Sequence, residues 1–190
     1  MKPKSNCFKF SVMAAMLGAL FASGSAVFAN SSSFTGSGTY TFVTGNFSYD
    51  GAAPALVLTG SGNTNALGFI TFQTTAEDSP TVTTCTAPDG SAGTTFAPVQ
   101  SDSALISKKG ILYITAIGAT AGSECVSNST GAASGNTTYT VTGGTGTLTG
   151  ASGSLLVTFT AQTLAAPGTP PGSNGLFGSG QFTFIGSLSK

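Results

Sequence analysis

The sequence predicts a single all-β domain, an antiparallel β-barrel of about eight strands, and three observations support this fold class. Short stretches alternate apolar or aromatic residues with Thr, Ser or Gln, which is the period of a half-buried strand. Turns rich in Gly, Asn and Asp separate these stretches, and none has the 3.6-residue period of a helix. Only 6% of the residues are charged, whereas 14 are Phe, so the chain has the apolar side chains that a core requires.

The alternating stretches locate the strands. Tyr40 and Phe42 lie on one face of the first clear stretch, and Leu67 and Phe69 lie opposite Ile70 and Phe72 in a later one. Together the stretches indicate about eight or nine strands. In chain order they cover residues 39–44, 47–49, 55–59, 67–73, 81–86, 111–117, 124–126, 138–142, 154–160 and 181–185.

Three segments are expected to differ from this alternation. Residues 87–104, which contain Pro88, Gly93 and Pro98, are predicted to form a long connection. Residues 111–117 are apolar on both faces, which predicts the most buried strand; a helix is the alternative, but the β-branched and aromatic content favours a strand. Residues 165–175 are rich in Pro and Gly and are predicted to form a loop.

A similarity between the two ends of the domain favours a barrel over a sandwich. Residues 34–42 and residues 176–184 share a pattern of aromatic residues, Gly, Ser and Thr. If the first and last strands lie side by side, they close the sheet and leave no exposed edge. A β-sandwich is the main alternative. A right-handed β-helix is the other, although the chain shows no fixed repeat period.

The first 29 residues have the three parts of a secretory signal peptide. Lys2, Lys4 and Lys9 precede an apolar run over residues 10–21, and small residues follow up to Ala29. A membrane anchor is the alternative, but the run is shorter than the roughly 20 residues needed to span a bilayer. We therefore expect cleavage after Ala29, one domain over residues 30–190, and a secreted or periplasmic protein with no transmembrane segment.

The charge of residues 30–190 excludes several partners. These residues include three lysines and six acidic residues, which gives a formal net charge of −3, and they contain no arginine and no histidine. Nucleic-acid binding requires several basic side chains, so we do not expect it. The acidic residues are Asp50, Glu77, Asp78, Asp89, Asp102 and Glu124.

Cys85 and Cys125 are the two cysteines that remain after the signal peptide. In an oxidising compartment an isolated pair indicates a disulfide, which here would contribute roughly 4 kcal/mol in the chain-entropy model. Free or metal-binding thiols are the alternative. Without histidine or a C-x-x-C spacing, a zinc site has little support.

No residue is predicted to be catalytic or to bind a metal or cofactor. The absence of histidine excludes Ser-His-Asp and Cys-His chemistry. Glu77 and Asp78 are adjacent, so on a strand they would point to opposite faces and in a loop they would be solvated. Lys108 and Lys109 are expected in solvent, just before the strand predicted at residues 111–117. Calcium is not expected, because no D-x-D-x-D-G spacing is present.

Residues 139–153, YTVTGGTGTLTGASG, resemble a stretch of the dirigent and allene oxide cyclase superfamily. The resemblance covers 15 residues and implies an eight-stranded antiparallel barrel with an internal apolar cavity. Sites of that family use acids with an arginine often nearby, and this chain has no arginine, so the resemblance implies no reaction here. The residues themselves indicate a tight hairpin, because glycine permits positive φ and close packing.

Three roles remain open from the sequence. The first is a non-catalytic exported barrel that binds a small apolar ligand or a partner surface. The second is a structural or adhesive surface protein, with a homo-oligomer as one form, and the third is a cofactor-free cyclase or isomerase, which would need an acid pointing inward. The aromatic side chains that could line a cavity, or fill a core, are Tyr40, Phe42, Phe69, Phe72, Tyr113, Phe159, Phe182 and Phe184.

Overall fold

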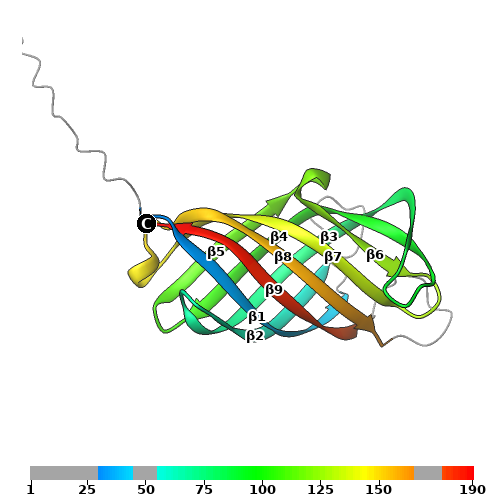
Figure 1. The fold of residues 1–190 in the computed structure, drawn as a ribbon, viewed down its shortest axis with the longest axis horizontal. Coiled ribbons are helices and arrows are strands. Elements are labelled where there is room, and N and C mark those ends of the chain that lie inside the picture. The colour runs from blue at the N-terminus through cyan, green and yellow to red at the C-terminus, as the bar shows by residue number, and fades with distance from the viewer. Residues whose placement is uncertain (1–29, 45–54, 165–176) are drawn as a thin grey trace, which may run out of the picture.

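The computed structural model of the chain describes residues 30–44, 55–164 and 177–190, and it places nine strands and two short 3₁₀ turns in them (Figure 1). The expected signal peptide, the expected strand at residues 47–49 and the expected loop at residues 165–175 lie outside the described residues. The strands are β1 Ser32–Thr44, β2 Leu56–Thr64, β3 Gly68–Thr86, β4 Ala92–Ser107, β5 Gly110–Ile117, β6 Gly122–Ser127, β7 Ala132–Gly144, β8 Ser152–Thr163 and β9 Phe177–Ser189; the turns are η1 Ala119–Ala121 and η2 Gly146–Leu148.

Eight of these strands form a closed antiparallel ring in the order β1-β2-β3-β4-β5-β7-β8-β9, and β9 pairs back with β1. The short β6 lies between β4 and β7 beyond the end of β5. The barrel prediction is therefore confirmed, and the sandwich and β-helix alternatives are wrong. The two similar terminal segments do lie side by side: Phe34 is opposite Gly186, and Phe42 is opposite Gly178.

The predicted connection over residues 87–104 is wrong, because most of it is strand β4. This strand pairs with β3, β5 and β6, and only a short turn around Gly90 precedes it. Pro98 is tolerated because it lies at a register shift, where two partners in β4, Gln100 and Pro98, face consecutive residues of β3. The same pairing merges the two expected strands at residues 67–73 and 81–86 into the single long β3.

The segment expected to be the most buried strand, β5, has one buried and one outer face. Leu112, Ile114 and Ala116 are buried, whereas Tyr113 is 42% and Ile117 is 66% exposed. The expectation that β5 is buried on both faces is therefore wrong. Every strand of the barrel has one face on the outer surface, and in β5 this outer face also carries apolar side chains.

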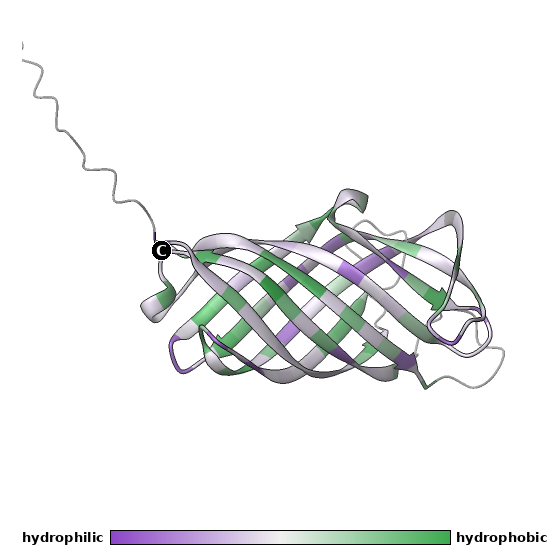
Figure 2. Cartoon of the chain, viewed as in Figure 1, coloured by the Kyte–Doolittle hydropathy of each residue, from purple (hydrophilic) through white to green (hydrophobic). Residues whose placement is uncertain are grey.

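Along the other strands, most buried residues are apolar and most exposed ones are Thr, Ser or Gln, although Phe69, Leu156 and Ile185 are exposed. Figure 2 shows the hydropathy alternating along the strands. The inner side chains form one core cluster. We call the end that holds the β2–β3, β4–β5 and β7–β8 turns the closed end. There Phe34, Ile70, Leu112 and Leu155 are almost completely buried, and each such side chain contributes about 1.5–3 kcal/mol. We call the opposite end, where β6 lies, the cavity end.

The sequence stretch at residues 139–153 forms the β7–β8 hairpin at the closed end, as its glycines indicate. Val141 pairs with Gly153, and η2 lies between the strands. Leu148 of the turn is buried in the core cluster, and Gly146 has a φ of 61°, which glycine adopts without strain. The stretch therefore has a structural role in closing the core.

Glycines on β1, β2 and β9 make room for aromatic rings inside the barrel. Gly180 lies opposite Tyr40, and Gly60 lies opposite Phe72. A Cβ atom at Gly180 would be 2.5 Å from Cζ of Tyr40, and one at Gly60 would be 2.6 Å from the ring of Phe72. The rings thus lie directly over the backbone of the opposite glycines. Aromatic–glycine pairs of this kind stabilise glycine in a sheet.

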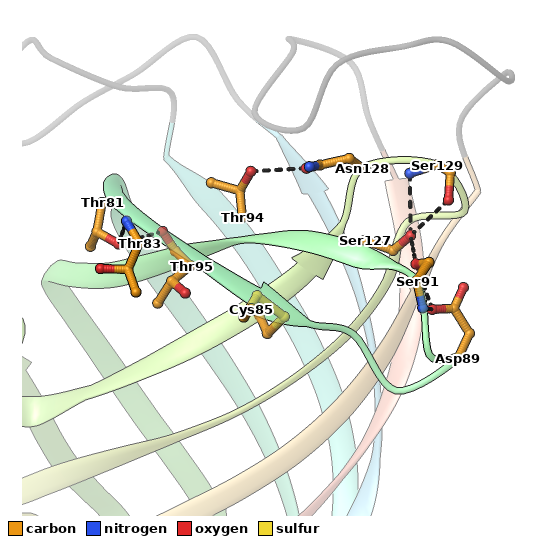
Figure 3. The surroundings of a disulfide bond; sticks show 11 residues. Thr81, Thr83, Cys85, Asp89, Ser91, Thr94, Thr95, Ser127, Asn128 and Ser129 are labelled. Carbon is orange, nitrogen blue, oxygen red and sulfur yellow. Dashed lines mark hydrogen bonds between the residues drawn. A yellow bond between two sulfur atoms is a disulfide. The ribbon is translucent and has the colours of Figure 1, made fainter.

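The predicted disulfide between Cys85 and Cys125 is confirmed, with the two Cα atoms 6.0 Å apart. It joins β3 to β6, which pair with opposite edges of β4, so it crosses β4 at the cavity end (Figure 3). Gly93 of β4 lies beneath it, where a Cβ atom would be 3.0 and 3.1 Å from the two sulfur atoms. Among the described residues, no helix has the length and apolarity needed to cross a membrane.

Candidate functional site

The described residues do not fill the inside of the barrel at the cavity end. A cavity there offers about 150 Å³ to the centres of water-sized molecules, and side chains from all nine strands line it. Most of its wall is apolar, with Leu58, Phe72, Val157 and Phe182 among the lining side chains. The cavity extends to Leu56 at the start of β2 and to Thr163 at the end of β8.

Six of the eight aromatic residues proposed from the sequence line this cavity: Tyr40, Phe42, Phe72, Phe159, Phe182 and Phe184. The other two proposals, Phe69 and Tyr113, are wrong. Phe69 is 60% exposed and Tyr113 is 42% exposed, both on the outer face. The cause is the two-residue period of a strand: Ile70 and Phe72 point inward in β3, so Phe69 points outward.

The aromatic side chains form a packed wall. The ring of Phe182 contacts those of Phe72 and Phe184 edge to face, with centroid distances of 5.1 and 4.9 Å. Tyr40 lies 6.5 Å from Phe182, centroid to centroid. Contacts of this geometry stabilise by about 0.5–1.5 kcal/mol each beyond the burial of area, so they hold these rings together as one wall of the cavity.

A row of hydroxyl groups crosses the cavity wall on β3, β4 and β7. Thr74 and Ser103 share a hydrogen bond of 2.6 Å, and Ser101 and the hydroxyl of Tyr139 share one of 2.7 Å. All four line the cavity. Because these groups bond to one another, they present a polar strip without an unsatisfied buried donor.

Two carboxyl groups also line the cavity, and the sequence analysis missed both. Asp78 of β3 and Glu124 of β6 are each half-buried and face the cavity, whereas they were expected among solvated acids. The hydrogen bonds of the described residues include none to either carboxyl group. A signal was present in the sequence: the inward alternation through Phe72, Thr74 and Ala76 continues to Asp78.

Burial shifts the proton affinity of these acids. Removal from water raises the pKa of Asp78 to about 6, and the neighbouring Glu77 adds to the shift. Removal from water likewise raises the pKa of Glu124 to about 8, with a further contribution from Asp78. The two therefore act as one pair that loses its protons in steps near neutral pH.

The two cavity tyrosines stay protonated. Burial raises the pKa of Tyr139 to about 12, against the opposing hydrogen bond from Ser101. Burial also raises the pKa of Tyr40, and the charges of Glu124 and Tyr139 act in the same direction. Both phenols therefore remain neutral near neutral pH and can donate a hydrogen bond.

The remaining charged groups lie elsewhere. The described lysines are Lys108 and Lys109 in the β4–β5 turn and Lys190 after β9, all at the closed end, and Nζ of Lys109 donates to the carbonyl of Ala66. Asp102 accepts hydrogen bonds from Gln100 and Thr115. The described residues contain no group of three or more His, Cys, Asp or Glu placed to hold a metal ion.

Asp89, the acid of the turn before β4, is held by its own hydrogen bonds. It accepts hydrogen bonds from the hydroxyl of Thr130 and from Ser91, and these bonds lower its pKa to about 2. Figure 3 shows Asp89 beside Ser91. Ser91 also bonds to Ser127, so this cluster ties the turn to the end of β6. Its role is to fix the rim near the disulfide.

Comparison of the chain with protein-family models, curated proteins and solved structures gave no match.

Proposed function

We propose that this chain is an exported, non-catalytic β-barrel domain that binds a small, mainly apolar molecule in its interior cavity. The observation that carries the proposal is the unfilled volume at the cavity end, with an aromatic wall on one side and polar groups on the other. Ligand sites in proteins have this composition: apolar surface with a few placed polar groups. The disulfide and the N-terminal segment support export.

The volume of the cavity limits the ligand. An apolar cavity of roughly 150 Å³ holds a molecule of about the size of benzene. We therefore expect single-ring or short branched aliphatic compounds to bind. The resemblance of residues 139–153 to dirigent and allene oxide cyclase proteins supports the same role, because that resemblance implies a barrel with an apolar cavity.

The test uses neutral probes of the right size. Toluene and benzyl alcohol are titrated into the protein by calorimetry, and each is expected to bind and to raise the melting temperature, since a ligand that binds only the folded state stabilises it. Failure of both probes to bind would contradict the proposal.

Two adjacent residues of β8 provide matched variants. Val157 lines the cavity, whereas Leu156 is on the outer face. Val157→Phe should fill the cavity and abolish probe binding, and Leu156→Phe should leave it unchanged. If Val157→Phe does not fold, Ala161→Leu adds volume at another lining position. Equal binding by the inner and outer variants would show that the probes bind elsewhere.

A cofactor-free barrel enzyme is the second candidate, because Asp78 and Glu124 face the cavity and have pKa values of about 6 and about 8. Acids in this range can accept or donate a proton near neutral pH. Proton abstraction from 1,2-benzisoxazole would report such activity. Turnover that disappears in Asp78→Asn and Glu124→Gln would support the enzyme, and absence of turnover in the wild type would count against it.

A structural or adhesive surface role is the third candidate. Its support is the outer face of β1, β2, β8 and β9, which carries rows of Thr, Ser and Gln without charge. The hydroxyl groups of Thr41 in β1 and Thr59 in the neighbouring β2 share a hydrogen bond of 3.4 Å. Sedimentation over a wide concentration range tests this role: a monomer at all concentrations would argue against self-association.

A further inference from the structure

We propose that the ligand carries a basic nitrogen, and that Asp78 and Glu124 bind it as an ammonium group at the polar side of the cavity while the aromatic wall holds the apolar part. This inference rests on the proposed binding function and names its ligand class. It depends on where the two carboxyl groups lie and on what is absent around them.

The first argument is that none of the hydrogen bonds of the described residues reaches Asp78 or Glu124. Both residues are half-buried and line the cavity. Removal of a carboxyl group from water costs stability unless the group takes up a proton or pairs with a cation. A cation bound in the cavity can contact both residues.

The second argument is the distribution of positive charge. Residues 30–190 contain no arginine and no histidine, and their three lysines are at the closed end. No side chain of residues 30–190 can therefore supply the counter-ion for the two acids. The cation that neutralises them is then a ligand, and the described residues hold no group of three or more His, Cys, Asp or Glu that would favour a metal ion.

The third argument is the wall that faces the acids. The rings of Tyr40, Phe72 and Phe182 line the same cavity. Aromatic faces attract an ammonium group through the ring quadrupole, and sites for organic cations combine such rings with carboxylates. The row formed by Thr74, Ser103, Ser101 and Tyr139 supplies oxygen acceptors for further N–H groups.

The groups around the pair determine how binding responds to pH. Glu77 is next to Asp78 in β3, Tyr139 faces Asp78 from β7, and Tyr40 faces Glu124 from β1. The tyrosines stay neutral, so the carboxyl pair sets the charge. Below about pH 6 both acids hold protons and attract an ammonium weakly; above about pH 8 both are ionised and attract it strongly.

The experiment compares three probes of one size: benzylamine, benzyl alcohol and benzoate, titrated into the whole domain between pH 5 and pH 8.5. At pH 8 benzylamine is expected to bind at least about tenfold more tightly than benzyl alcohol, and benzoate more weakly than either. The preference for the amine should shrink as the pH falls to 5. Equal affinities for amine and alcohol at every pH, or a preference for benzoate, would overturn the inference.

Isosteric variants test the two residues. The double variant Asp78→Asn/Glu124→Gln should bind benzyl alcohol as before and lose the preference for benzylamine. Asp102→Asn is the control, because it removes one carboxyl group from the same sheet at a residue that does not line the cavity and is hydrogen-bonded to Gln100 and Thr115. A double variant that keeps the preference would overturn the inference.

The results separate this inference from the function on which it rests. If benzyl alcohol binds and benzylamine binds no better, the ammonium site is wrong and the apolar cavity site stands. If none of the three probes binds, both proposals are wrong. The pH series needs only the wild-type protein, so the inference remains testable even if the double variant does not fold.

Discussion

The two ends of the barrel are built from the same strands and are filled differently. In β3, Ile70 is fully buried at the closed end, whereas Thr74 and Asp78, four and eight residues later, line the cavity. In β8, Leu155 is fully buried, whereas Val157 is a cavity residue. Large apolar side chains thus fill the closed end, whereas at the cavity end hydroxyl and carboxyl groups join the aromatic rings of the wall.

This difference predicts that stability resides at the closed end. Phe34→Ala should lower the free energy of unfolding by up to about 5 kcal/mol, because Phe34 is fully buried and the change leaves a new cavity. Phe159→Ala, at a half-buried ring that already borders empty space, should cost less than about 2 kcal/mol. Urea unfolding of both variants measures this, and equal losses would remove the distinction between the ends.

The disulfide is predicted to stabilise the cavity end, where side-chain packing contributes least. Replacing Cys85 and Cys125 by Ser should cost roughly 4 kcal/mol, since the bridge closes a long loop. Local unfolding should appear first at the cavity end, which amide hydrogen exchange would detect as faster exchange in β6 than in β8. Uniform loss of protection across the barrel would mean that the two ends unfold as one unit.

Gly→Ala substitutions at Gly186 and Gly180 compare the two ends of the barrel by adding one methyl group to each. A Cβ atom at Gly186 would meet backbone and the side chain of Leu155 at the closed end, whereas one at Gly180 would meet backbone and the ring of Tyr40 beside the cavity. Gly186→Ala should cost about 3 kcal/mol. Gly180→Ala should cost less, because the ring can move into empty space. Thermal unfolding of the two variants measures these losses. A larger loss in Gly180→Ala than in Gly186→Ala would be evidence against empty space beside Tyr40.

The smallest predicted effect is on the pH dependence of stability. Raised pKa values in the folded state mean that these acids cost nothing below their unfolded pKa values near 4 and cost most above about pH 8. Stability should therefore fall as the pH rises from 4 to 8, by an amount that solvent screening reduces because both groups are half-buried. Urea unfolding across this range measures it. Glu124→Gln should flatten the profile, because it removes the acid with the pKa of about 8.

The residues that were predicted correctly and those that were missed differ in physical kind. Periodicity located β1, β7, β8 and β9, because aromatic and β-branched residues alternate there with Thr and Ser. It failed for β4, where Pro98 and Gly93 are signs of a loop until the register shift and the overlying disulfide are known. Both of these depend on contacts with distant segments.

The candidate site was only half predictable for a related reason. The aromatic wall follows from alternation, so most of its rings were identified. Asp78 and Glu124 were missed because an acid is usually assigned to solvent, and only the length of β3 and the insertion of β6 turn these two inward. The distinction between a filled and an unfilled interior depends on side-chain volumes summed across nine strands.

The pairing of β1 with β9 has a consequence for how the chain is made. Ser32 is opposite Leu188, so β1 cannot pair with its second neighbour until β9 is available. Until then both edges of the sheet are open, and folding of this kind is slow because its contacts are distant in sequence. A circularly permuted gene that links β9 to β1 and opens the turn at Lys108 and Lys109 would turn this last contact into a local hairpin.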